Sequence, residues 1–508
     1  FAFALWDGSR RRLLAARDRI GKKPLYYTWR KGRLLFASEV KALLEHPAVE
    51  REIDPLSLAK YLTYECVPAP RTIFRDVAKL LPGHYLVADA AGVRTAPYWS
   101  PPQPPAPGTI TVREAEVAET LRHLLESAVR KRLISDVPLG VFLSGGIDSS
   151  TIVALLATGH AGRTIQTFSV GFEDRSFDES RWARQVARMF GTEHHEAILK
   201  AEEMLEALPQ VYGMLDEPFA DASVIPTYLL SAFARQFVTV VLGGDGGDEL
   251  FFGYPTFQAE RAARWVGWLP GWAFQALRRG VADRLPVSMD NFSPDFILKR
   301  FLLGMGYPAS VRHPIWLSSF DLQGLKAIFP AFDDEMAAGL FQEWEELPSG
   351  WSRPERWDAI GYGYLRLYLQ DDVLVKVDRA SMAHGLEVRA PFLDGEVVEM
   401  VYGLPWTLKL RGWRTKHILK QTMAGLLPAE IIHRPKKGFG IPMAKWLRGP
   451  LKDLATDLLA PDRLRRAGLF QPAEVQRLLD EHLRGRFDHR KPLWTLLAFE
   501  LWRERYLT

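Results

Sequence analysis

The seven residues that begin at Ser144 read Ser-Gly-Gly-Ile-Asp-Ser-Ser. Gly145 and Gly146 would let backbone N–H groups approach a phosphate closely, and Ser149 and Ser150 add hydroxyl donors. Asp148 would repel phosphate unless a cation lay between them, which predicts a Mg²⁺ ligand. The lysine of a Walker A loop is missing, so a different phosphate cradle is indicated. An ordinary strand-to-helix turn is the alternative, and it leaves the aspartate and the serines unexplained.

A second glycine-rich turn runs from Gly243 to Glu249 and reads Gly-Gly-Asp-Gly-Gly-Asp-Glu. Asp245, Asp248 and Glu249 are three acids beside a turn of the same kind as the first. When two such turns follow neighbouring strands, they meet at one edge of a parallel sheet. We therefore predict a shared metal–phosphate site, with a solvated acidic loop as the alternative.

Two further charged segments lie toward the C-terminus, at 371–394 and 433–439. Helical core segments seldom carry so many charges as 371–394, so we expect this helix, which runs into a loop, to face a polar cleft. Five of its residues suit a structural charge network rather than direct contact: Asp378, Arg379, Glu387, Arg389 and Asp394. The turn at 433–439 supplies cations that suit growing charge on a phosphate, although a basic turn standing alone is more often simply exposed.

Strands that alternate with amphipathic helices must position these turns, and this pattern is typical of a parallel α/β sheet. Buried strands are predicted at 139–143, 164–171 and 237–242. Helices are predicted from about Ser149 and over 179–190, the latter closed by Gly191. The first 100 residues predict β-hairpins with one short helix around 39–44. The stretch 101–108 has five prolines in eight residues, which predicts a linker, and from about Phe257 the pattern is mainly helical.

Composition narrows the class of protein. A chain of 508 residues is too long for one hydrophobic core of ordinary size, so two or more domains are expected. With 65 basic and 61 acidic residues the charge is nearly balanced, whereas a nucleic-acid binder more often has a concentrated basic excess. No segment has the roughly 20 apolar residues that a membrane helix needs, so no membrane partner is expected. Cys66 is the single cysteine, which favours a reducing cytoplasm and a buried bystander. The start lacks Met and is not a signal peptide, which predicts a truncated or processed product.

With these segments in hand, Ser144–Ser150 resembles the pyrophosphate loop of the ATP-pyrophosphatase superfamily. The rest of the chain is similar to glutamine-dependent asparagine synthetases. The matching stretches run in the family's order from about Arg17 to Pro442: RDRIGKKPLYY, FASEVKALL, SGGIDSS, FSVGF, DEPFAD, GGDGGDELFFGY, DDVLVKVDRASMAHGLEVRAPFLD and RPKKGFGIP. The resemblance implies an α/β fold in which residues 112–508 form a parallel-sheet ATP-pyrophosphatase domain with a largely helical C-terminal part. Residues 1–100 would be the remnant of a type 2 glutamine amidotransferase domain, part of an α+β sandwich, joined by a linker over 101–111.

The resemblance also implies roles for single residues. Residues of the adenosine pocket would be Phe142, Leu143, Val170, Gly243 and Gly244. Asp148 and Asp248 would share Mg²⁺, and Lys436 would be the catalytic lysine. Asp245 would also be catalytic: it stands where the family usually has Glu, one methylene longer, which is associated with forming an aspartyl-AMP intermediate. Asp372 resembles the catalytic acid, but it lies six residues before Asp378 where five is usual, so Asp371 is an alternative.

The activity implied is ATP-dependent conversion of aspartate to asparagine through β-aspartyl-AMP, with ammonia from glutamine. The partners implied are therefore ATP, aspartate, and glutamine or ammonia, and a homodimer is considered. The glutaminase nucleophile is expected upstream, with none in this chain. Two rivals remain: an amidotransferase for another carboxylate (a sugar, peptide or ring-closing substrate), and a non-catalytic nucleotide-binding regulator.

Overall fold

The computed structural model describes residues 1–109, 113–159, 164–291, 293–352 and 354–507. Its central feature is a five-stranded sheet of order β10-β9-β8-β11-β12, in which every neighbouring pair is parallel. The strands are β8 (Leu139–Phe142), β9 (Gln166–Phe172), β10 (Glu193–Leu199), β11 (Val240–Leu242) and β12 (Glu387–Arg389). The predicted α/β class with a parallel sheet is confirmed.

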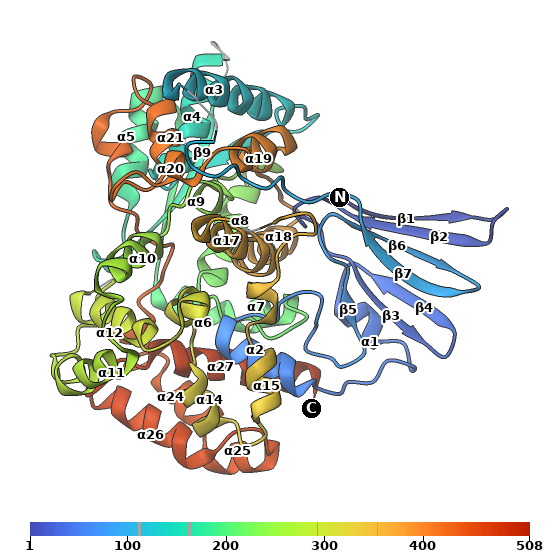
Figure 1. The fold of residues 1–508 in the computed structure, drawn as a ribbon, viewed down its shortest axis with the longest axis vertical. Coiled ribbons are helices and arrows are strands. Elements are labelled where there is room, and N and C mark those ends of the chain that lie inside the picture. The colour runs from blue at the N-terminus through green and yellow to red at the C-terminus, as the bar shows by residue number, and fades with distance from the viewer. Residues whose placement is uncertain (110–112, 160–163, 292, 353, 508) are drawn as a thin grey trace.

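Helices pack against both this sheet and one another, because each strand is followed by an amphipathic or wholly buried helix. Helices α4 (Ile147–Gly159), α5 (Ser180–Phe190) and α8 (Val224–Arg235) pack against the strands, and α3 (Glu114–Lys131) packs against α4. Helix α5 ends as predicted, with Gly191 in the left-handed conformation (φ 61°) as its cap. Figure 1 shows this α/β part at the top of the molecule and a helical part below it.

Two segments differ in secondary structure from the sequence prediction. The run Phe237–Leu242 forms strand only over β11, because the N–H groups of Phe237 and Val238 still donate to the carbonyl of Ala234 at the end of α8. The segment 371–394 is not simply a helix followed by a loop. It contains the end of the π-helical η3 (Tyr364–Val373), then α18 (Leu374–Met382), and β12, which pairs with β11 at the edge of the sheet.

The N-terminal region forms two antiparallel sheets that project from one side of the molecule (Figure 1). One has the order β1-β2-β6-β7 and the other the order β4-β3-β5. Their strands are β1 (Ala2–Asp7), β2 (Arg12–Arg17), β3 (Tyr26–Arg30), β4 (Arg33–Ala37), β5 (Ala78–Lys79), β6 (His84–Asp89) and β7 (Gly92–Pro97). The predicted short helix is α1 (Val40–Leu44). Strand β1 is an edge strand, and Phe3, Leu5 and Trp6 on it are exposed.

A second helix in this region, α2 (Pro55–Tyr64), was missed by the prediction of a single short helix. Its start carries the expected signals: Asp54 caps it by accepting from the N–H of Ser57 at 2.7 Å, and Pro55 occupies its first turn. The helix packs against α13 (Arg312–Leu317) and α27 (Arg490–Tyr506), so it lies within the core of the C-terminal helices. Residues before the linker therefore share a core with residues near the C-terminus.

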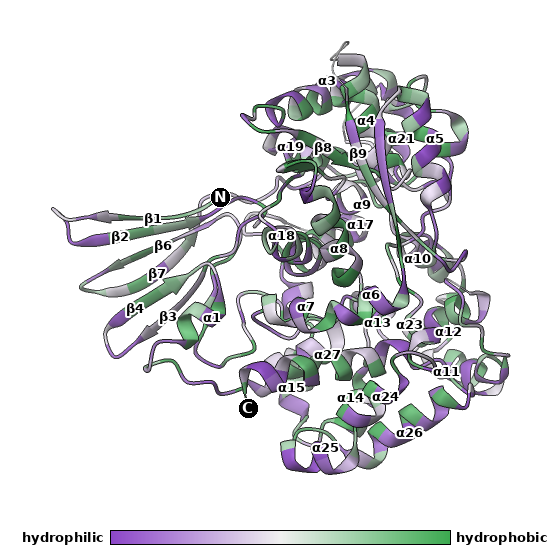
Figure 2. Ribbon diagram, turned by 180° about the vertical axis from the view of Figure 1, so that it is seen from behind, coloured by the Kyte–Doolittle hydropathy of each residue, from purple (hydrophilic) through white to green (hydrophobic). Residues whose placement is uncertain are grey.

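The remaining chain is mostly helical, as predicted. Its helices after β11 include α10 (Pro255–Val266), α11 (Gly271–Gly280), α12 (Pro294–Met305), α17 (Arg356–Gly363), α19 (Gly395–Tyr402), α21 (His417–Thr422) and α26 (Pro472–Leu483). Hydrophobic and hydrophilic residues alternate along α26 in Figure 2, as an amphipathic helix requires. Among the described residues, no helix is both long and apolar enough to cross a membrane.

The proline-rich stretch lies against residues 351–352, since the indole N–H of Trp351 donates to the carbonyl of Pro101 at 3.0 Å. The end of the predicted linker, at 110–111, and the predicted domain start at 112 lie outside the described residues. The predicted boundaries themselves stay predictions.

Candidate active site

The two glycine-rich turns meet at the carboxyl ends of β8 and β11. These strands are direct neighbours, with Leu242 opposite Val141. The first turn leads into α4 and the second into α9 (Gly247–Leu250). The side chain of Asp148 lies against the second turn, since a Cβ on Gly247 would be 2.5 Å from its Oδ1. Glycine is needed there because any side chain would push the two turns apart.

Two carboxylates from the two turns converge on one ammonium group. The Nζ of Lys416 lies 2.6 Å from Oδ2 of Asp148 and 2.6 Å from Oδ1 of Asp248. Lys436 forms a further ion pair with Asp248. Burial by itself would raise the pKa of Asp248, but the two ammonium groups outweigh it and hold that pKa below its usual value. The cluster therefore brings together the predicted residues Asp148, Asp248 and Lys436.

Lys416 was missed by the sequence analysis. It is 4% exposed, and it stands at the start of α21 with a left-handed backbone (φ 54°), which is uncommon for a non-glycine residue. Its side chain passes Gly253 so closely that a Cβ on that glycine would be 2.2 Å from Cε. A lone lysine in the run RTKHILK gives no signal of this placement, because the contact spans 268 residues.

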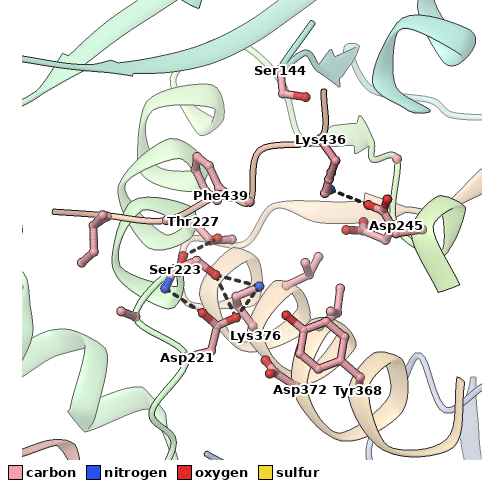
Figure 3. Close-up of a pocket in the computed structure, with 18 of the residues that line it drawn as sticks. Ser144, Asp221, Ser223, Thr227, Asp245, Tyr368, Asp372, Lys376, Lys436 and Phe439 are labelled. Atoms are coloured by element: carbon pink, nitrogen blue, oxygen red, sulfur yellow. Dashed lines mark hydrogen bonds and ion pairs between the residues drawn. The ribbon is translucent and has the colours of Figure 1, made fainter. Parts of the chain in front are cut away.

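A second charged cluster lies on α18 and the segment before it. The Nζ of Lys376 donates to Oδ2 of Asp221 at 2.6 Å and to Oγ of Ser223 at 2.7 Å. Asp372 is 3% exposed and lies one helical turn before Lys376. Burial, together with the Asp221 carboxylate, raises the pKa of Asp372 well above its usual value. Figure 3 shows Asp221, Lys376 and Asp372 gathered below the turn that carries Lys436.

The same region distinguishes Asp371 from Asp372. The Oδ2 of Asp371 accepts from the N–H of Ala69 at 2.9 Å and lies 3.6 Å from Arg366. Asp372, in contrast, lines the main cavity. Asp372 therefore lies where it can contact a ligand, whereas Asp371 binds the N-terminal region through Ala69.

A cavity of about 560 Å³ joins both clusters. Most of the predicted nucleotide-binding and catalytic residues line it: Phe142, Leu143, Ser144, Asp148, Ser149, Val170, Gly243, Gly244, Asp245, Asp248, Asp372 and Lys436. Gly145, Gly146 and Ser150 do not line it. Ser150 is fully buried in α4, and its hydroxyl has no hydrogen-bond partner among the described residues. The roles assigned to these residues stay predictions.

Beyond the charged groups, the cavity has an aromatic wall that the sequence analysis did not foresee. Its rings come from separate parts of the chain: Tyr254, Phe296, Trp344, Tyr368 and Trp494. Aromatic faces of this kind bind apolar or ring-shaped parts of a ligand. The space therefore suits a nucleotide together with a second substrate.

Cys66 also reaches this cavity, but it is 5% exposed. Burial raises the pKa of its thiol well above the usual value, and the neighbouring carboxylates Asp372 and Asp371 add to the effect. A thiol in this state is a poor nucleophile at neutral pH. The geometry agrees with a bystander role.

The charges of 371–394 that were predicted to be structural do form ion pairs. Arg379 contacts Asp216 at 2.8 Å, Arg389 contacts Glu387 at 2.7 Å, and Asp394 contacts Arg132 at 2.9 Å. Asp378 binds Lys23 at 2.6 Å, which links the N-terminal sheets to α18. These contacts hold the segment that carries Asp372 and Lys376.

The fold and the site together define the ATP-pyrophosphatase class. A phosphate-type loop follows one strand of the parallel sheet, an acidic loop follows the next, and Lys416 and Lys436 bind the acidic side chains of these loops. Comparison with known families agrees: the asparagine synthase family matches residues 120–504, and a glutamine amidotransferase domain matches residues 1–99. The chain belongs to the asparagine synthase family. It is thus a carbon–nitrogen ligase of a family that uses ATP.

Individual relatives support this assignment. A provisionally named asparagine synthetase (glutamine-hydrolyzing) of Mycobacterium tuberculosis is 37% identical over 99% of this chain and 76% of its own length. Asparagine synthetase (glutamine-hydrolyzing) 1 of Bacillus subtilis is 30% identical over 99% of this chain and 77% of its own length. Amidase chry2 of Gibberella zeae is 26% identical over 94% of this chain and 75% of its own length.

Proposed function

We propose that this chain catalyses ATP-dependent amidation of aspartate to asparagine, through a β-aspartyl-AMP intermediate. The observation that carries the proposal is the convergence of Asp148 and Asp248 on Lys416, with Lys436 beside them, under the glycine-rich turn at Ser144. Opposite charges packed at the end of two strands suit the polyphosphate of ATP, whose negative charge the lysines would neutralise.

In the first step an oxygen of the β-carboxylate attacks the α-phosphorus, and the bond to the β-phosphate breaks, so pyrophosphate leaves. In the second step ammonia attacks the acyl carbon, AMP leaves, and the nitrogen loses a proton. Asp245 and Asp372 border the cavity, and the pKa of each is raised by burial. A carboxylate with a raised pKa is suited to take that proton.

Mg²⁺ fits the cluster. Asp148 and Asp248 already share one cation in this structure, the ammonium of Lys416, so their oxygens can converge on a cation. The described residues contain no group of three or more His, Cys, Asp or Glu side chains that could hold a metal. Mg²⁺ usually binds through one or two carboxylates plus substrate phosphates, which matches a two-aspartate site. When bound it would neutralise charge on the phosphate oxygens.

The family and relatives support glutamine as the usual source of ammonia, through an amidotransferase domain. A cytoplasmic location and a homodimer remain predictions as well.

The test uses aspartate labelled with ¹⁸O in its β-carboxylate, incubated with ATP, Mg²⁺ and ammonium. Mass spectrometry should find asparagine, pyrophosphate, and AMP that carries one ¹⁸O, since the acyl oxygen stays on the phosphate. Steady release of ADP and phosphate would overturn the proposal, and so would AMP without label.

A second candidate is amidation of a larger carboxylate, and the aromatic wall of the cavity favours it. Rings such as those of Tyr254 and Trp344 have no obvious use for a substrate as small as aspartate. The same assay, run with uronic acids and with peptide carboxylates in place of aspartate, separates the two. AMP formation that depends on one of these acids and not on aspartate would establish the second candidate.

A further inference from the structure

Three tryptophans stand far out in solvent around the turn that joins α10 and α11. Trp265, Trp268 and Trp272 are 73%, 79% and 73% exposed, and they fall within eight residues of sequence. A tryptophan side chain carries about 150–250 Å² of largely apolar surface, so leaving three in water is costly. Clusters of exposed apolar side chains of this kind mark interaction surfaces.

Four more exposed apolar residues follow in the same helical segment: Leu277, Val281, Ile297 and Leu298. We call these seven residues the tryptophan patch. These residues are not needed for the core of this part of the molecule, because α10, α11 and α12 bury other apolar side chains, which include Ala263, Phe274 and Leu302. Helices α11 and α12 pack together at the outer edge of the molecule, on the side away from strands β1–β7 (Figures 1 and 2).

The charge of this segment is strongly one-sided. Residues 261–284, which include five of the seven patch residues, contain five arginines (Arg261, Arg264, Arg278, Arg279 and Arg284) and one carboxylate, Asp283, so they carry 5 − 1 = +4. The stretch up to Leu298 adds two carboxylates, Asp290 and Asp295, which form ion pairs with Lys445 and Lys299. The whole chain of 508 residues has the same net charge of +4. None of the five arginines forms an ion pair with a residue that the structure describes, whereas many arginines elsewhere do.

We propose that the tryptophan patch binds the surface of a membrane that contains anionic phospholipid. Helices that lie in the headgroup layer combine tryptophan and other apolar residues with arginine or lysine, because indoles favour the interface and cations favour anionic lipid. The prediction that a membrane is not a partner rests on the absence of a spanning segment, which does not bear on surface binding. Asn291 and Phe296, which precede Ile297 and Leu298 of the patch in the sequence, line the main cavity, so a bound membrane would lie beside the active site.

A second copy of this chain is a less suitable occupant. In a symmetric dimer the patch would face itself, and the five arginines of each copy would be brought together with a single carboxylate, Asp283, from each copy beside them. An anionic lipid surface supplies the opposite charge over the whole patch.

The test measures flotation of the full chain with vesicles of phosphatidylcholine and with vesicles containing equal parts of phosphatidylcholine and phosphatidylglycerol. We expect binding to the anionic vesicles, at least tenfold weaker for the triple variant Trp265→Ala, Trp268→Ala, Trp272→Ala. Trp29→Ala, a tryptophan on β3 that is 42% exposed, is the matched control and should bind like the unchanged chain. The variant Arg264→Gln, Arg279→Gln, Arg284→Gln should also bind weakly, and salt should weaken the unchanged chain in the same way.

Sedimentation velocity without vesicles, together with the ammonium-dependent activity, checks that each variant stays folded. Equal flotation of the triple tryptophan variant and the unchanged chain would overturn the proposal. So would an unchanged chain that binds no vesicles. If that chain instead formed a dimer that the tryptophan variant lost, the patch would be assigned to self-association.

Discussion

Substitution of single lysines tests whether the cluster at Asp148 and Asp248 is catalytic. Lys436 and Lys437 are a matched pair for this test, because they are neighbours in the sequence. Lys436 pairs with Asp248, whereas the neighbouring Lys437 contacts, within the described part of the chain, the carbonyl of Ser176 at 3.4 Å. Lys436→Ala should lower kcat by about 10²–10³, because it removes a countercharge from a reacting phosphate. Lys437→Ala should retain near-normal kcat. Steady-state kinetics with saturating ATP and ammonium would check both, and similar kcat values for the two variants would withdraw the role of Lys436.

A buried acid away from the site, Asp358, is expected to make the stability of the protein depend on pH. Asp358 on α17 is 2% exposed, neither of its oxygens has a hydrogen-bond partner among the described residues, and burial raises its pKa to about 6. Below about pH 3 it is protonated in both the folded and the unfolded chain, so it has little effect on the free energy of unfolding. As the pH rises toward 6, the unfolded chain loses the proton first, so stability falls, by at most about 3 kcal/mol.

Asp358→Asn should therefore raise the melting temperature at pH 7 and change it much less at pH 4. Thermal unfolding of both proteins between these pH values would show the difference growing as pH rises. A constant difference, or none at pH 7, would mean that Asp358 is not a strained acid.

At the scale of elements, the turn between β8 and α4 depends on one of its two glycines. Gly145 has φ 70°, and a Cβ there would be 2.4 Å from the backbone of Trp182 on α5. Gly146 has room, with its nearest neighbour 3.4 Å away. Gly145→Ala should cost about 2–4 kcal/mol of stability, from the strained backbone and the clash. Gly146→Ala should cost less than about 1 kcal/mol, and chemical denaturation of the two variants would contradict the assignment if they were equally stable.

At the scale of the whole molecule, the N-terminal region is part of the fold it precedes. Leu58, Tyr61, Leu62 and Phe74 are at most 1% exposed and belong to the same core as Phe499 and Trp502. Removing the residues before the linker would therefore expose the core that they share with the C-terminal helices.

Deletion of residues 1–111 should therefore give an aggregated or partly unfolded chain, since it opens a large apolar surface on α27. Deletion of residues 1–10 is the comparison, because β1 is an exposed edge strand that pairs only with β2. Circular dichroism melting and gel filtration would measure both. A monomeric, cooperatively melting product of the larger deletion would show that the synthetase part folds alone.

Which nitrogen donor can be used also depends on the residues of the whole chain. Cys66 is the single cysteine among the 508 residues, and it is buried with a raised thiol pKa. A polypeptide of these residues should use ammonium and should not hydrolyse glutamine. Glutamate release is the measurement, with Cys66→Ala as control. Glutamate that depends on ATP and disappears in Cys66→Ala would reveal a working thiol.

The sequence by itself determined the class of fold, the two glycine-rich turns and twelve of the residues that line the cavity. These features are local, since the spacing of Ser144–Ser150 after a buried strand fixes a turn whatever lies around it. The alternation of strands and helices likewise predicted the parallel sheet that the structure confirms.

Tertiary structure alone decided which distant side chains meet. Lys416 joins Asp148 across 268 residues, and Asp371 accepts from the N–H of Ala69, which lies 302 residues away in the sequence. The extent of β11 and the placement of α2 in the C-terminal core were likewise settled by packing. Local patterns carry no information on such contacts, because each results from burying surfaces that are far apart in the chain.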